Sequence, residues 1–130
     1  MSSSPRTTTT TKPTILLIHG AWHTPATWNP LRSALDSSSY PTLPSSNSLV
    51  SSHHNDIAII RHELERLILS ESKQVILVCH SYGGMVGSGA VTGLEAYRRK
   101  AEEKKGGVVH CLFLCAFLVP IGKGGGGYGG

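Results

Sequence analysis

The sequence is poor in acidic residues and in cysteine, and it lacks a long uninterrupted apolar segment. Of its 130 residues, 8 are acidic and only 3 are cysteines, at Cys79, Cys111 and Cys115. The number of cysteines is odd and each of them lies inside an apolar run. Their spacing fits neither a zinc site nor a disulfide framework. We interpret them as small buried side chains in a reducing compartment and expect a cytoplasmic protein with no metal site.

The longest apolar stretch, 108–121, contains His110 and Pro120 and is shorter than the roughly 20 residues that a membrane span needs. We therefore expect a soluble protein that has no membrane partner. The Ser/Thr-rich segment 1–13 has no apolar core, so we expect a disordered N-terminal tail rather than a secretory signal. The segment 123–130 is nearly all glycine and predicts a second flexible tail.

Positive charge is in excess, with 12 basic residues and a formal net charge of +4. Five of the cations fall within 98–105, where Glu102 and Glu103 interrupt them. No aromatic residue alternates with these cations, and no nucleic-acid fold signature is present, so we expect no nucleic-acid partner. A solvated helix end or loop is the favoured interpretation of this stretch, and a polyanion site is the alternative.

Apolar runs and helical periodicity alternate along the chain. Continuous apolar runs at 15–18, 75–79 and 108–119 are typical of parallel strands buried on both faces, and a weak strand is expected near 42–43. Apolar spacing predicts helices over 26–35, over 57–68 and from Gly83 to about Lys100. Thr27 is a candidate cap for the first of these, and Asn55 or Asp56 for the second. This order predicts an α/β fold, a three-layer sandwich with a mostly parallel sheet, in one domain over 14–122.

A serine stands where the second strong strand turns into a helix, in the run Cys79-His80-Ser81-Tyr82-Gly83-Gly84. A serine nucleophile must project from such a turn, which requires small residues two positions to either side. Gly83 satisfies this requirement, and Cys79 is small although glycine is usual there. Tyr82 falls in the first helical turn, where its backbone N–H can face a developing oxyanion. An ordinary strand-to-helix turn is the alternative, and a phosphate loop is disfavoured because no Walker-type lysine follows.

The first strand ends in His19-Gly20-Ala21-Trp22, which predicts the second oxyanion donor. Gly20 allows the backbone to turn inward, and Ala21 or Trp22 would supply the amide. We interpret His19 as a structural brace for this loop rather than as the catalytic base. His19, Gly20, Trp22 and His80 are also candidate substrate contacts, while Trp22 and Trp28 could equally wall an acyl pocket or belong to the core.

Together these motifs resemble the α/β-hydrolase superfamily, and the closer similarity is to its small fungal-type and plant methylesterase-like branch. The similar segments are the strand with His-Gly-Ala-Trp at 15–22, the proline-bearing segment 40–44 and His-Ser-Tyr-Gly-Gly at 80–84. The resemblance covers about 14–122. It implies the N-terminal half of an α/β-hydrolase fold and a serine hydrolase without cofactor, whose partner is a small acyl or ester substrate.

A serine hydrolase also needs a histidine base and an orienting carboxylate, which follow the serine in this superfamily. After Ser81 the carboxylates are Glu95, Glu102 and Glu103, all in helix or linker, and the only histidine is His110. His110 begins its strand, at the end opposite Ser81. We therefore expect the chain to stop before the acid and base, with weak or absent activity of its own.

Two further expectations follow from this incomplete site. Partial sheet coverage should leave apolar side chains exposed around Phe113, Leu114, Phe117 and Leu118. The competing hypothesis is a catalytically incompetent product, either a degenerate fragment or a binding module. A lyase, a thioesterase or a lactonase would show the same two motifs as an esterase.

Overall fold

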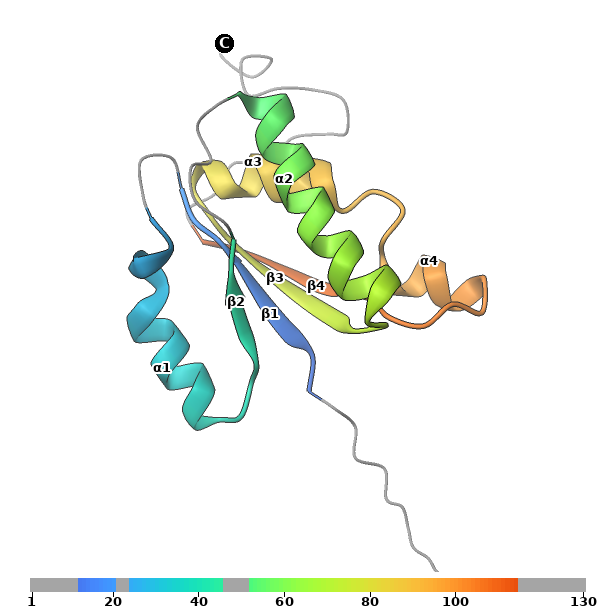
Figure 1. Ribbon diagram of the computed structural model, residues 1–130, viewed down its shortest axis with the longest axis horizontal. Coiled ribbons are helices and arrows are strands. Elements are labelled where there is room, and N and C mark those ends of the chain that lie inside the picture. The colour runs from blue at the N-terminus through green and yellow to red at the C-terminus, as the bar shows by residue number, and fades with distance from the viewer. Residues whose placement is uncertain (1–11, 21–23, 46–51, 115–130) are drawn as a thin grey trace, which may run out of the picture.

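Four parallel strands form the centre of the molecule in the computed structural model, which describes residues 12–20, 24–45 and 52–114 (Figure 1). The strands are β1 (Thr14–Ile18), β2 (Thr42–Pro44), β3 (Gln74–His80) and β4 (Gly107–Leu114). Their order in the sheet is β2-β1-β3-β4, and each neighbouring pair is parallel. The carboxyl ends of all the strands therefore meet at one edge of the sheet.

Helices cover both faces of this sheet, as Figure 1 shows. On one face lie the short 3-10 helix η1 (Pro25–Trp28) and helix α1 (Asn29–Ser37). On the other face lie α2 (His53–Glu65), its π-helical continuation η2 (Arg66–Ser70) and α3 (Tyr82–Ala90). The short helix α4 (Ala96–Ala101) precedes β4 and contacts it. This arrangement confirms the predicted three-layer α/β fold with a parallel sheet.

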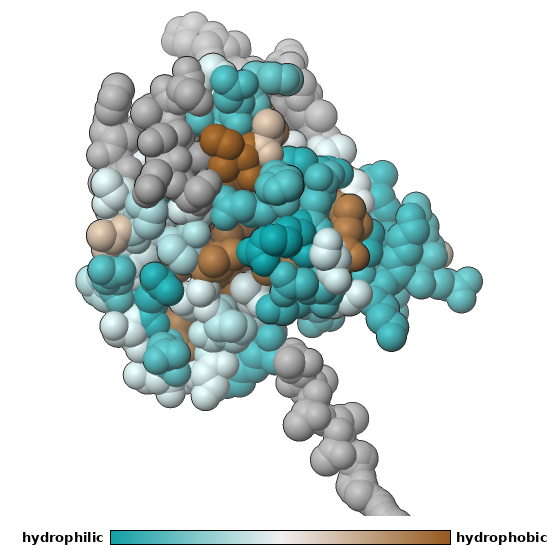
Figure 2. Space-filling view, viewed as in Figure 1, coloured by the Kyte–Doolittle hydropathy of each residue, from teal (hydrophilic) through white to brown (hydrophobic). Residues whose placement is uncertain are grey.

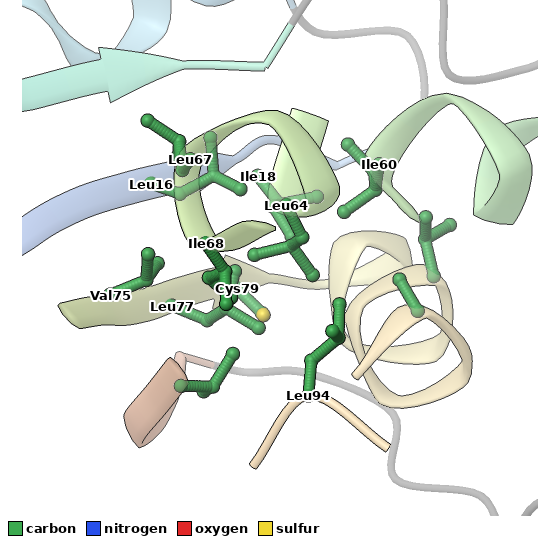
Figure 3. Close-up of a cluster of buried hydrophobic side chains, with 13 residues drawn as sticks. Leu16, Ile18, Ile60, Leu64, Leu67, Ile68, Val75, Leu77, Cys79 and Leu94 are labelled. Atoms are coloured by element: carbon green, nitrogen blue, oxygen red, sulfur yellow. The ribbon is translucent and has the colours of Figure 1, made fainter. Parts of the chain in front are cut away.

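Alternate residues of the strands supply two apolar cores. Leu16 and Ile18 point toward α2 and α3, where they join a large cluster that includes Leu77, Cys79 and Leu64 (Figure 3). The intervening strand residues contact η1 and α1 in a second cluster, made of Ile15, Leu17, Val78 and Trp28. The continuous apolar runs in the sequence thus arise because each strand is buried on both faces.

The helix caps differ from those predicted. Ser52 caps α2, and its side chain accepts a hydrogen bond of 3.1 Å from the amide of Asn55. Neither Asn55 nor Asp56 is the cap, because α2 begins at His53, before the first periodic apolar residue. Thr27 lies inside η1 rather than at the start of a helix, so its predicted capping role was also wrong.

The single helix predicted from Gly83 to about Lys100 is two helices. α3 ends at Ala90 and α4 starts at Ala96, with Gly93 between them at a φ of 83°. This left-handed conformation interrupts a helix and favours glycine. The connection is also tied to the sheet edge, because the carbonyl of Leu94 accepts a 2.8 Å hydrogen bond from the amide of Val108 in β4.

The last strand contains an irregularity that the apolar run did not reveal. Val75 pairs with Val108 but Ile76 pairs with His110, so Val109 is an extra residue in a bulge. Beyond the bulge, Leu112 and Leu114 are 45% and 38% exposed, as expected for uncovered apolar residues. Phe113 instead packs against the larger core, and the segment 115–119 of the predicted strand lies outside the described residues, as do Phe117 and Leu118.

No helix among the described residues is long and apolar enough to cross a membrane.

Candidate active site

Ser81 lies at the carboxyl edge of the sheet, immediately after β3 and immediately before α3. Its backbone is left-handed, with φ 54° and ψ −123°. A non-glycine residue rarely adopts this conformation, which costs about 1–3 kcal/mol and is commonest at functional sites. Hydrogen bonds hold the turn on both sides, since the Ser81 amide donates to the carbonyl of Leu114 (3.2 Å) and its carbonyl accepts from Gly84 (2.9 Å).

Close packing between α3 and the sheet explains the small residues that follow Ser81. A Cβ atom at Gly83 would lie 2.6 Å from the carbonyl oxygen of Ile18, and one at Gly87 would lie 2.7 Å from the Cys79 sulfur. Both distances are shorter than real Cβ contacts, so neither site admits a side chain without movement. Cys79 is fully buried in this contact, and burial raises the pKa of its thiol to about 12. It is therefore a packing residue.

The loop that leaves β1 reaches the Ser81 turn. A Cβ atom at Gly20 would lie 3.1 Å from the Cβ of Ser81 and 3.3 Å from Nδ1 of His80. The structure thus brings together the two motifs that the sequence singled out. Ala21 and Trp22 lie outside the described residues, so their roles as oxyanion donors and the substrate contact of Trp22 stay predictions.

His19 ties this loop to the neighbouring strand. Its side chain is 1% exposed, and Nδ1 lies 3.2 Å from the hydroxyl of Ser45, just past the end of β2. The amide of Ser45 donates in turn to the carbonyl of Leu17 (2.9 Å). These contacts support a structural brace at the base of the loop, and they leave little of the imidazole surface for a substrate.

His80 and Trp28 meet edge to face beside the Ser81 turn. Their ring centroids lie 6.4 Å apart, with an interplanar angle of 89°. Trp28 is 6% exposed and packs with Leu17 and Val78 under α1, so it belongs to the core. His80 is half-buried at the same edge as Ser81, which is compatible with its predicted substrate contact.

A buried carboxylate behind the turn was missed by the sequence analysis. The hydroxyl of Tyr82 donates to Oδ2 of Asp56 across 2.6 Å, and Asp56 is fully buried on α2. Burial, and then this hydrogen bond, raise the pKa of the Tyr82 phenol. The signal was present in the spacing, since Asp56, Ile60 and Leu64 recur every four residues and so share one helix face. A carboxylate on a buried apolar face calls for a donor.

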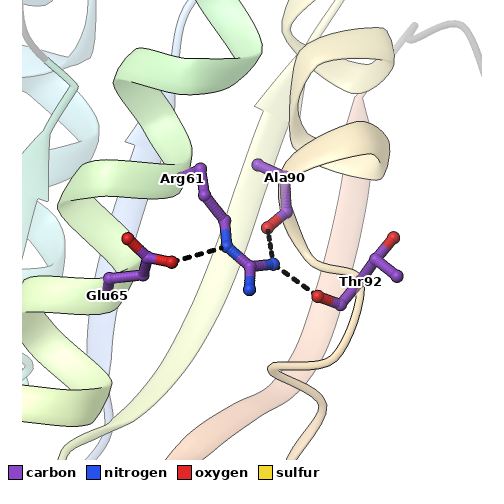
Figure 4. A network of polar contacts seen from close by, with 4 residues as sticks. All are labelled: Arg61, Glu65, Ala90 and Thr92. Carbon is purple, nitrogen blue, oxygen red and sulfur yellow. Dashed lines mark hydrogen bonds and ion pairs between the residues drawn. The ribbon is translucent and has the colours of Figure 1, made fainter.

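Arg61 fixes the far end of α3 (Figure 4). From α2, its Nε donates to Glu65 (3.1 Å), while Nη1 donates to the carbonyls of Ala90 (3.1 Å) and Thr92. The last carbonyls of a helix have no partner within the helix, so an arginine at this place caps α3. Tyr82 and Arg61 therefore join the two ends of α3 to α2, which holds the helix that positions Ser81.

His110 does not approach Ser81. It is exposed and pairs with Ile76, four residues before the pair of His80 with Leu114. At about 3.3 Å per residue this places it roughly 13 Å along the strand from the carboxyl edge. Within the described ranges, no group of three or more His, Cys, Asp or Glu residues could hold a metal ion.

Comparisons with known proteins agree with this architecture. A family model described as "Alpha/beta hydrolase family" matches residues 15–129. The chain is 34% identical over 119 residues to a protein described as "Alpha/beta hydrolase nvfD" from Aspergillus novofumigatus (strain IBT 16806), covering 86% of this chain and 46% of that protein. It therefore spans about half the length of this curated relative.

Two solved structures share the fold. One is the mature form of the lipase BlEst2 from Bacillus licheniformis, with a TM-score of 0.58, 18% identity, and coverage of 83% of this chain and 43% of that one. The other is an extracellular alpha/beta-hydrolase from a Paenibacillus species, with a TM-score of 0.55, 20% identity, and coverage of 84% and 42%. Both matches again extend over less than half of the other protein.

Proposed function

Because the chain belongs to the alpha/beta hydrolase family, we propose that Ser81 is the nucleophile of a serine hydrolase whose complete form cleaves carboxylic esters. The observation that carries this proposal is the left-handed Ser81, which lies at the carboxyl edge beside Gly20 of the β1 loop. A strained serine between a parallel strand and a helix is the geometry of a nucleophile elbow. The predicted domain, 14–122, contains both of these segments.

The chemistry follows from these positions. The hydroxyl oxygen of Ser81 attacks the acyl carbon and forms a tetrahedral intermediate with a negatively charged oxygen. Backbone amides of Tyr82, at the start of α3, and of Ala21 or Trp22, in the β1 loop, donate to that oxygen. The alcohol leaves, and water then hydrolyses the acyl-serine. A histidine must take the serine proton, and we propose that it and its carboxylate come from the part of the fold that this chain does not span.

The substrate class is supported by chemistry and by one relative. The Bacillus licheniformis neighbour is described as a lipase, which is an ester hydrolase. A small acyl compound is therefore the proposed substrate, and no cofactor is required for this reaction. A thioesterase, a lactonase or a lyase would use the same nucleophile turn. We also propose a cytoplasmic location, because Cys79 and Cys111 are free thiols.

One observation favours a second candidate, a catalytically incompetent protein that retains the scaffold. His110 is the only histidine after Ser81, and it lies along β4 away from the carboxyl edge. Without a base, serine is a weak nucleophile. On this hypothesis the chain binds small molecules or partners without turnover, or has no function of its own.

Labelling with a fluorophosphonate probe separates the two candidates. We expect slow labelling that mass spectrometry maps to Ser81, that is lost in Ser81→Ala, and that persists in the control Ser88→Ala on the same helix. Hydrolysis of p-nitrophenyl esters by the 130-residue chain should be weak or absent. Absence of any label would support the incompetent protein, and a label that survives Ser81→Ala would refute the proposed nucleophile. A transcript that continues in frame past residue 122 with an Asp and a later His would support a complete triad.

A further inference from the structure

The amino edge of the sheet, opposite Ser81, carries a hollow of about 690 Å³ that the proposed hydrolase site does not use. It lies where the strands begin, between the turn before β3, helix α4 and the connection into β4. Gln74, the first residue of β3, lines it, so the length of β3 separates it from Ser81. At about 3.3 Å per residue this distance is roughly 20 Å. We call this hollow the lysine basin.

Its defining residues are Lys12, Lys73, Lys100, Lys104, Lys105 and Tyr97. These are five of the six lysines in the whole chain, and among the described residues Glu71 is the only carboxylate that lines the hollow with them. The sequence showed three of the lysines in one polar stretch, and a solvated face was the favoured interpretation. The fold adds Lys12 and Lys73, which come from distant parts of the chain.

Carboxylates neutralise only part of this charge. Glu71 pairs with Lys73 (3.0 Å) and also with Arg66 (2.7 Å), and these cations hold the pKa of its carboxyl below the ordinary value. Lys104 pairs with Glu102 (3.0 Å). Lys100 and Lys105 form no ion pair with any described residue. The ammonium of Lys12 donates to the carbonyl of Ser38 and lies 4.6 Å from the centre of the Tyr40 ring. Several lysines with few carboxylates around one hollow give it a positive potential, which favours a bound anion.

The backbone beneath the lysines is fixed. Arg99 is 8% exposed, and its guanidinium donates to the carbonyls of Lys105 (2.8 Å) and Gly106 (3.2 Å). The amide of Gly107 donates to the carbonyl of Lys73 (3.0 Å). A Cβ atom at Gly106 would lie 2.7 Å from that same carbonyl oxygen. Two lysine-bearing loops are therefore held against each other, which sets the spacing of the backbone positions from which their lysines project.

Tyr97 adds an aromatic surface to the basin. Tyr97 lies on α4, about one helical turn before Lys100, and is 72% exposed. An exposed ring that lines a hollow can stack on a planar group, and such stacking tolerates different bases. The side of the molecule that carries α4 is largely hydrophilic in Figure 2, so an apolar partner is not favoured there.

We propose that the lysine basin binds a nucleoside polyphosphate, with its phosphates on the lysines and its base on Tyr97. Lysine binds phosphate as a point charge, and several ammonium groups match the charge of a triphosphate chain. The hollow also lies within the size range of small-molecule sites, roughly 300–1,000 Å³. The hollow does not include Ser81, so this proposal can be correct or wrong whatever the outcome for the esterase proposal.

The test measures binding of ATP, inorganic tripolyphosphate and adenosine to the full chain by calorimetry at low ionic strength. ATP should bind more tightly than tripolyphosphate, and adenosine should bind weakly. Lys100→Gln combined with Lys105→Gln should raise the Kd for ATP roughly tenfold, since two ammonium–phosphate contacts are lost. Tyr97→Ala should raise it roughly fivefold and leave tripolyphosphate binding unchanged.

A matched control separates a site from general attraction. Ala34→Glu combined with Ala58→Glu lowers the net charge by the same amount on exposed positions of α1 and α2. This control should keep the parent affinity for ATP. The proposal is overturned if ATP does not bind, if the control weakens binding as much as the lysine double variant, or if Tyr97→Ala leaves ATP binding unchanged. All of the replaced side chains are exposed, and far-UV circular dichroism verifies that each variant folds.

Discussion

Replacing Tyr82 with Phe should destabilise the chain at neutral pH. The change removes the hydroxyl that donates to Asp56, while the Asp56 carboxylate stays fully buried. The lost hydrogen bond is 2.6 Å long and ends on a carboxylate. Hydrogen bonds to charged groups contribute about 1.5–3 kcal/mol. We expect a loss of about 2 kcal/mol in the free energy of unfolding, which corresponds to a Tm lower by roughly 7–9 °C for a domain of this size.

The same bond predicts a dependence on alkaline pH. Burial and the contact with Asp56 raise the pKa of the Tyr82 phenol, so the folded state holds this proton more tightly than the unfolded state. The stabilisation is therefore complete below the unfolded pKa of about 10 and is lost as the pH rises through the higher folded value. The difference in stability between the parent and Tyr82→Phe should shrink above about pH 10.

Urea unfolding followed by circular dichroism measures both effects, at neutral pH and above pH 10. Tyr97→Phe is the control, because this tyrosine is 72% exposed. We expect the control to differ from the parent by less than about 0.5 kcal/mol. A Tyr82→Phe variant as stable as the control at neutral pH would refute the claim that Asp56 secures the start of α3.

Other positions give sharp expectations. Gly83→Ala should lower stability by about 3 kcal/mol or more, because the new Cβ would meet a rigid β1 carbonyl at 2.6 Å. Gly89→Ala, whose Cβ would meet the mobile end of an isoleucine, should stay within about 1 kcal/mol of the parent, and equal losses in thermal unfolding would contradict this account. Arg61→Met should cost about 1–2 kcal/mol and speed hydrogen exchange at the end of α3 around Ala90, and unchanged exchange would argue against the cap. At pH 8, iodoacetamide should alkylate Cys79 at least roughly tenfold more slowly in the native chain than in urea, as peptide mapping would show, because burial raises its pKa to about 12.

The sheet and the site turn were predictable because they depend on local signals. Continuous apolar runs identified β1 and β3, since both of their faces are buried. The small residues around Ser81 identified the turn, because α3 contacts a backbone carbonyl at Gly83 and the Cys79 sulfur at Gly87. Burial of a strand on both faces and close contact at a glycine each leave a mark on the residue types at neighbouring positions, which the sequence shows directly.

The features that the sequence did not reveal depend on contacts between distant segments. Asp56 was assigned to a cap because acidic residues are common at helix starts, but its partner lies 26 residues away. The bulge at Val109 depends on the register with β3. The lysine basin also required the fold, since Lys12 and Lys73 join the polar stretch only when the strands are aligned.

The backbone of Ser81 has a consequence for how this protein can change through mutation. Its φ of 54° suits glycine, so a glycine there would remove a conformational cost of about 1–3 kcal/mol. A lineage selected for folding alone would gain from that replacement. On the proposed function, stability and catalysis therefore favour different residues at position 81, and a chain that has lost the proposed activity should lose this serine early.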